Sequence, residues 1–155
     1  MPVLQGPTHA KQLAQQRIRR GRSRLELARL EYQRTLKYEA GTLTQKEIAS
    51  AASISQPSVS EALEKARKVD EPREGFSGGS LREIFLRYSA DEMPKEQLID
   101  ELSRWEYDEL STADSLDGLL ADLPNTFHEV EDALINGIIE ADVYNTVLEH
   151  IRNKN

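Results

Sequence analysis

The chain has 155 residues, of which 38% are hydrophobic and 30% charged, and it contains no cysteine. Disulfides and thiolate metal sites are therefore excluded, and no stretch approaches the run of about 18 apolar residues that a membrane span needs. The first ten residues contain no basic segment followed by an apolar run, so we expect no signal peptide and a soluble, cytoplasmic protein.

The net charge of −7 is divided unevenly along the chain. Residues 1–69 hold 13 basic and 6 acidic side chains, a net charge of +7, whereas residues 70–155 hold 7 basic and 21 acidic side chains, a net charge of −14. Such an asymmetry is typical of a protein whose basic half binds nucleic acid.

A long helix is expected over about residues 8–40, where helix-forming residues predominate. Gly21 interrupts this pattern and is expected to break or weaken the helix, and Gly41 is expected to end it. Beyond Gly21, apolar side chains recur at spacings of three and four and can bury one face. They are Leu25, Ala28, Tyr32 and Leu36, widened by Leu27 and Leu30.

Two short helices are expected next. Thr44 and Glu47 have the spacing of a capping box, which predicts a helix from there to about Ala52. A turn over residues 53–54 follows. Ser55 can cap the second helix, and Pro57 is tolerated in its first turn because the N–H it lacks would be unpaired there. We expect this helix to reach about residue 68.

Residues 70–79 contain a proline and three glycines and mark the change in the sign of the charge. They predict a flexible linker between a basic domain, residues 8–69, and an acidic module, residues 80–155. In the module, Ser80 with Glu83 and Thr126 with Glu129 are further capping boxes. Pro94 begins another helix, a short helix is expected near residues 116–120, and a turn at 136–137 precedes a final helix. The fold class expected is all-α, with the module built from two helical hairpins.

The segment from Leu43 to Ala66 resembles the prokaryotic helix-turn-helix family of repressors and antitoxins, through "LTQKEIA", a turn and "ISQPSVSEAL". In such units the second helix enters the major groove of DNA. Ala49 is the small residue where the helices cross. The expected core is Ile48, Ala52, Ile54, Val59, Ala62 and Leu63. The family usually has glycine in the turn where this chain has Ser53, and serine adopts a left-handed conformation only at a cost.

The resemblance implies that the exposed side of the second helix reads base edges, through Ser55, Gln56, Pro57, Ser58, Ser60 and Glu61. A helix N-terminus and nearby cations suit phosphates. The candidate phosphate contacts are Thr44, Gln45, Lys46 and Lys65, with the arginines Arg17, Arg19, Arg20, Arg22 and Arg24. The alternative interpretation is a plain helical hairpin with a polar surface.

The acidic module is expected to dimerise the protein, to bind a protein partner such as a toxin, or to be solvated surface around a small core. The long helix that precedes residue 43 is the alternative dimerisation element. A partner-facing patch is hypothesised at Phe85, Tyr88, Trp105 and Tyr107, and packing of these aromatics in the core is the favoured alternative.

The residues give no sign of an enzyme, a metal site or a cofactor. The three histidines lack metal-ligand spacing, and "GFSGGS" lacks the lysine of a phosphate-binding loop. We therefore expect a cytoplasmic DNA-binding transcriptional regulator, a repressor or antitoxin, which binds double-stranded DNA as a homodimer. The alternative is an inhibitor or adaptor that binds a protein through its acidic module.

Overall fold

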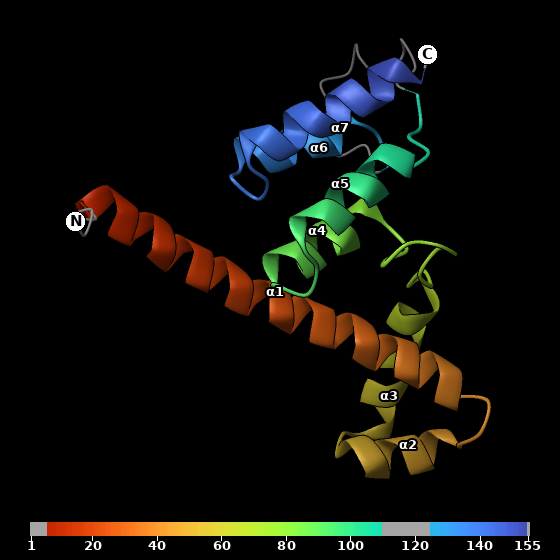
Figure 1. Ribbon diagram of the computed structural model, residues 1–155. Coiled ribbons are helices and arrows are strands. Elements are labelled where there is room, and N and C mark those ends of the chain that lie inside the picture. Colours follow the sequence, from red (N-terminus) through yellow and green to blue (C-terminus); the bar gives the residue numbers. More distant parts are fainter. Residues whose placement is uncertain (1–5, 110–124, 155) are drawn as a thin grey trace, which may run out of the picture.

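The computed structural model describes residues 6–109 and 125–154, and within these residues it is helical without strands, which confirms the all-α expectation (Figure 1). The predicted short helix near 116–120 lies outside the described residues. The helices are α1 (Pro7–Glu39), α2 (Gln45–Ala52), α3 (Gln56–Arg67), α4 (Leu81–Ser89), α5 (Lys95–Arg104), α6 (His128–Ile135) and α7 (Ala141–Asn153).

The long helix α1 runs through Gly21 without a break, so of the two expected effects of this glycine, a break or a weakening of the helix, the first is absent. A glycine in a helix interior costs only about 1 kcal/mol relative to alanine. The good helix formers on both sides of it outweigh that cost. As a result α1 is a single rod about 50 Å long, at about 1.5 Å per residue.

Two groups of helices pack on α1 at different points along its length (Figure 1). The α2–α3 pair lies against its C-terminal end, where Leu36 is buried, and α4 lies against its middle, where Leu27 is buried. Leu25 and Tyr32 were predicted to be buried and are instead 52% and 45% exposed. The prediction assumed one buried face, whereas α1 has contacts on two sides and leaves a third free.

The α2–α3 pair has a small core of its own, completed by α1. Leu36 of α1 packs with side chains from both short helices, and the buried members of this core are Leu36, Ile48, Ala49, Val59, Leu63 and Ala66. The crossing residue Ala49 is among them. Most of the core that the sequence predicted is therefore present.

The four helices α4 to α7 share a second, larger core in which α5 packs along α7. Its buried side chains include Leu81, Ile84, Leu98, Leu102, Val130, Val143 and Val147. Ser80 caps α4 as predicted, accepting a hydrogen bond from the Glu83 N–H at 3.1 Å. The predicted cap at Thr126 is wrong, because α6 begins at His128 with Phe127 as its N-cap. The Glu129 carboxylate instead accepts a hydrogen bond from the Asn125 N–H at 2.8 Å.

The segment that was expected to be a flexible linker packs against three helices. Arg34 of α1 donates hydrogen bonds to the Asp70 carbonyl, and Glu101 of α5 accepts from both the N–H and the hydroxyl of Ser77, at 2.6 and 2.7 Å. Gly79 is buried and its N–H donates to Glu83 of α4 at 3.1 Å. The glycines of this segment therefore permit close packing and do not act as a loose tether.

Among the described residues, no helix combines the length and the apolar composition required to cross a membrane.

Candidate nucleic-acid interface

The two short helices begin at capped residues, as their sequences predict. The Thr44 hydroxyl accepts a hydrogen bond from the Glu47 N–H at 3.2 Å and donates one to the Glu47 carboxylate at 3.0 Å. The Ser55 hydroxyl accepts a hydrogen bond from the Ser58 N–H at 3.3 Å. Since each cap removes an otherwise unpaired N–H, both helix starts are fixed locally.

The turn between the helices contains a strained residue. Ser53 has φ 58° and ψ 43°, in the left-handed region, and it ends α2 as a C-cap. The Ile54 N–H then donates to the Ala49 carbonyl at 3.0 Å, which closes the last turn of α2. Ser53 thus adopts the conformation for which the helix-turn-helix family normally uses glycine.

The side of α3 that faces away from the core carries the predicted base-contacting residues. Val59, Leu63 and Ala66 are buried. The predicted contacts Ser55, Gln56, Pro57, Ser58, Ser60 and Glu61 are all exposed. The structure therefore brings them together on an accessible surface, next to α2.

Hydrogen bonds tie part of this surface to itself. The Ser60 hydroxyl donates to the Gln45 side-chain oxygen at 3.0 Å, which joins α3 to the start of α2. The Ser55 and Ser58 hydroxyl oxygens lie 2.8 Å apart. These bonds orient the serines before any ligand arrives, and the sequence had given no indication of the contact between Ser60 and Gln45.

Four of the predicted phosphate contacts lie beside the base-contacting set. Thr44, Gln45 and Lys46 are exposed at the N-terminus of α2, where unpaired N–H groups favour an anion. Lys65 is exposed on α3, 3.6 Å from the Glu61 carboxylate. These residues and the exposed side of α3 together form the candidate interface.

The five arginines predicted to contact phosphates lie elsewhere. The part of α1 that shares a hollow with α3 begins at Arg29, which is five residues after Arg24 and 12 residues after Arg17. At about 1.5 Å per residue, these two arginines are roughly 8 and 18 Å away along the rod. Arg19 donates to the Asn136 carbonyl at 3.1 Å, beside the acidic module. Because α1 does not bend at Gly21, one chain cannot fold these arginines back onto its own α3.

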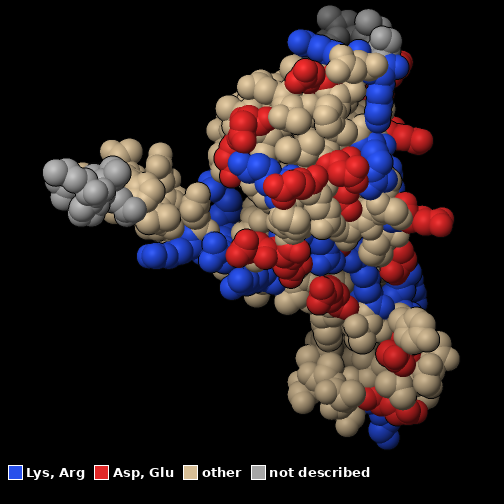
Figure 2. Space-filling model, in the orientation of Figure 1, with Lys and Arg blue, Asp and Glu red and all other residues tan. Residues whose placement is uncertain are grey.

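The candidate interface itself is almost neutral. Residues 44–69 carry four basic and three acidic side chains, a net charge of +1, so the charge of +7 on the first half of the chain comes mainly from α1. On the face shown in Figure 2, the end of the molecule formed by α2 and α3 is mostly uncharged. Glu61 and Glu64 are exposed on α3.

The aromatic residues proposed as a partner-facing patch belong largely to the core. Phe85 and Trp105 are buried, and the Trp105 indole N–H donates to Asn125 at 2.7 Å. Tyr88 and Tyr107 are half-buried, and their hydroxyls donate to Glu140 and to the Leu102 carbonyl. The positions of all four aromatic side chains agree better with packing in the core than with a patch that faces a partner.

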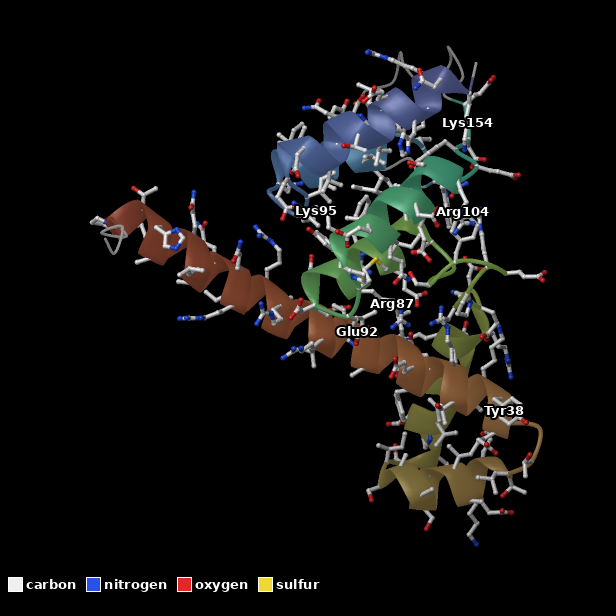
Figure 3. The ribbon with its side chains drawn as sticks, viewed as in Figure 1. Tyr38, Arg87, Glu92, Lys95, Arg104 and Lys154 are labelled. Atoms are coloured by element: carbon white, nitrogen blue, oxygen red, sulfur yellow. The ribbon has the colours of Figure 1, made fainter. Side chains whose placement is uncertain are left out.

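Sequence reasoning missed a charged network that joins the two halves. Arg34 donates two hydrogen bonds to the Glu83 carboxylate, at 2.6 and 2.9 Å, and Arg87 donates to the same group at 2.8 Å. Burial alone would raise the pKa of Glu83, but the hydrogen bonds from Arg34, Gly79 and Arg87 outweigh it and lower the pKa to about 2. Arg87 also contacts Glu92 at 2.8 Å (Figure 3). The Glu83–Arg87 pair has the i, i+4 spacing of a helix. Arg34 and Glu83, in contrast, are too far apart in the sequence for any local spacing to reveal their pairing.

No protein-family model matches the chain, and neither a curated protein nor a solved structure was found that matches it.

Proposed function

We propose that the protein is a sequence-specific regulator of transcription that binds double-stranded DNA, with α3 lying in the major groove. The observation that carries this proposal is the α2–turn–α3 unit. Two capped helices are joined by a left-handed residue, and α3 presents an exposed row of Ser, Gln and Pro side chains. This is the arrangement by which helix-turn-helix units place a helix in a groove. A repressor or antitoxin would act by occupying a promoter.

The chemistry of the exposed row suits base edges. Gln56 can form two hydrogen bonds with adenine, and the serine hydroxyls can bond any base. Glu61 can accept from the amino group of cytosine, although its carboxylate raises the cost of approaching phosphates. We expect Gln56 to be the main reader, since it lies in the first turn of α3, where such helices contact bases.

The test is selection of a preferred duplex from a random library by the full chain, followed by fluorescence anisotropy over a salt series. Gln56→Ala should weaken binding by about 1–3 kcal/mol and relax the preference at one base pair. Gln97→Ala, an exposed glutamine on α5, is the matched control and should change nothing. The proposal fails if no duplex is preferred, or if the two variants bind alike.

A second candidate is an inhibitor or adaptor that acts on a protein. It is favoured by the near-neutral charge of residues 44–69 and by the two exposed glutamates on α3, which a basic protein surface would suit better than DNA. Here the acidic module and α3 would form the contact. This candidate would be favoured if the full chain bound a purified protein encoded in the same genome and if the DNA-library selection gave no preferred duplex.

A further inference from the structure

One side of α1 carries an apolar stripe exposed to solvent. Ile18, Leu25 and Tyr32 are spaced by seven residues and are 74%, 52% and 45% exposed. The exposed small residue Ala14 precedes them, and two more, Gly21 and Ala28, lie between them. The resulting alternation of four and three residues is the spacing of the contact positions of a coiled coil. The stripe lies almost opposite the side of α1 that packs on α4.

We propose that this stripe pairs α1 with α1 of a second copy of the chain, antiparallel and centred near residue 23. In that register Leu25 faces Gly21 of the second copy, Ile18 faces Ala28, and Tyr32 faces Ala14. Every large side chain then meets a small one, which lets both helices approach closely and fill the space between them. A Cβ at Gly21 would have nothing within 4 Å, so the space for a facing side chain is open.

Charges beside the stripe also select the antiparallel arrangement. In the proposed register Arg17 lies beside Glu31 of the second copy. Glu31 is 63% exposed and has a contact of 3.9 Å with Arg87 of its own chain. A parallel pair would instead place Arg17 beside Arg22, and Arg24 beside Arg29, so that like charges repel. The antiparallel pair still brings Arg22 and Arg24 each near its own counterpart at the centre, and added salt screens these two repulsions.

The pairing leaves α4 of each chain clear of the contact, but the two ends of the stripe adjoin other parts of their own chain. Tyr32 shares a hollow with Ala62 of α3, and Ile18 shares one with Ile135. The α4 side of α1 points outwards on both copies, while the α3 side lies about a sixth of a turn from the stripe. The two-fold axis of an antiparallel pair is perpendicular to the plane of the two helices, so both α2–α3 units project from the same face. Leu36 lies 13 residues from the centre, which puts the two units about 39 Å apart along α1. Half-sites one turn apart on DNA are separated by about 34–36 Å.

The match between the spacing of the two α2–α3 units and that of DNA half-sites rests on the proposed function. The pairing of the two α1 helices does not, and it can be tested without DNA. Sedimentation equilibrium of the full chain should show a dimer. Replacing Ile18 and Leu25 together by Gln should raise its dissociation constant about tenfold or more, with the helical circular dichroism unchanged. Tyr38→Gln is the matched control, because Tyr38 is 80% exposed at the end of α1 and off the stripe (Figure 3). A monomer in the unmodified chain, or equal effects of the two changes, would overturn the proposal.

The register has its own test. Gly21→Leu should weaken the dimer, because the new side chain meets Leu25, and adding Leu25→Ala should restore it. In a parallel pair Gly21 would face Gly21, and the leucine would strengthen the dimer instead. The substitution also favours helix, so unfolding does not complicate the result.

The direction of the pair can be measured by distance, since the chain has no cysteine and a single one can be introduced. A spin label at Gln12→Cys, an exposed site on α1, lies 11 residues from the proposed centre. Gln12 is on the side of α1 away from the stripe, so the two labels lie about 20 Å apart across either kind of pair. The antiparallel dimer adds about 33 Å along α1, which gives a distance of nearly 40 Å, against about 20 Å in a parallel dimer. A short distance would overturn the antiparallel arrangement.

Discussion

Arg34 and Glu83, which lie 49 residues apart in the chain, form a bidentate ion pair that joins α1 to α4, with N···O distances of 2.6 and 2.9 Å. The cation comes from the basic half of the sequence and the anion from the acidic half. Glu83 is only 2% exposed, so this buried pair is one of the contacts that fix the two oppositely charged parts to each other.

Removing the charge of Glu83 should destabilise the protein markedly. Glu83→Gln leaves Arg34 and Arg87 without their shared anion, and breaking a buried pair of this kind costs on the order of 3 kcal/mol. The free energy of unfolding in urea measures the loss. Glu92→Gln is the control, because Glu92 also pairs with Arg87 but is exposed, and it should cost less than about 1 kcal/mol. Equal losses in the two variants would contradict the role assigned to Glu83.

Acid should destabilise the protein through the same carboxylate. The pKa of Glu83 falls from its ordinary value of 4.5 to about 2 on folding, so the unfolded chain takes up this proton first. The stabilisation is therefore complete above pH 4.5 and is lost as the pH falls from 4.5 towards 2. Urea unfolding between pH 5 and 2 tests this, and Glu83→Gln should depend on pH less steeply than the unmodified chain. Parallel curves for the two proteins would refute the prediction.

The left-handed residue in the turn should favour glycine over alanine. At position 53, Ser53→Gly should be more stable than Ser53→Ala by about 1 kcal/mol, because alanine pays the cost of its Cβ in that conformation. At Ser50, which is exposed within α2, the order should reverse by a similar amount. Thermal unfolding of the four variants provides the comparison, and alanine being preferred at both positions would show that the turn is not left-handed.

The packed segment before α4 should not tolerate a side chain at Gly79. A Cβ there would lie 2.5 Å from the Glu71 carbonyl oxygen, so the backbone has to move. Gly79→Ala should cost about 1–3 kcal/mol of unfolding free energy. At Gly41, where the nearest atom would be 3.8 Å away, the same change should be tolerated. If Gly79→Ala were equally harmless, the segment would behave as the flexible linker that its composition suggests.

Local signals predicted most of the helices, because a cap or a stop acts within a few residues. Thr44, Ser55, Ser80 and Pro94 each stand at the helix start expected of them. The sequence did not predict contacts between residues that are far apart along the chain. Whether Leu25 or Leu27 is buried depends on which side of α1 meets α4.

The candidate interface shows the same division between local and distant signals. The exposed row on α3 follows from the helical period and was predicted. The separation of the arginines of α1 from α3 depends on whether the rod bends at Gly21, which propensity alone does not decide.

If two copies pair as proposed and bind DNA, the arginines of α1 should contribute unequally. Arg22 and Arg29 lie on the side of α1 that faces α3, whereas Arg24 lies on the other flank of the stripe. Arg22→Gln should therefore lower DNA affinity and reduce the salt slope by about one, while Arg24→Gln should change both less. Anisotropy titrations between low and moderate salt measure the two quantities. Identical salt slopes for the two variants would show that the proposed dimer geometry does not determine which arginines contact DNA.

The near-neutral charge of residues 44–69 bears on how such a regulator would find its target. Long-range attraction to the phosphate chain speeds encounter and holds a protein on DNA while it slides. With a net charge of only +1 on these residues, a single copy would gain little encounter speed and little retention on DNA, and it would leave non-target DNA sequences quickly. Efficient searching would then belong to the paired form alone, so that the concentration of the protein sets how fast a promoter is occupied as well as how fully.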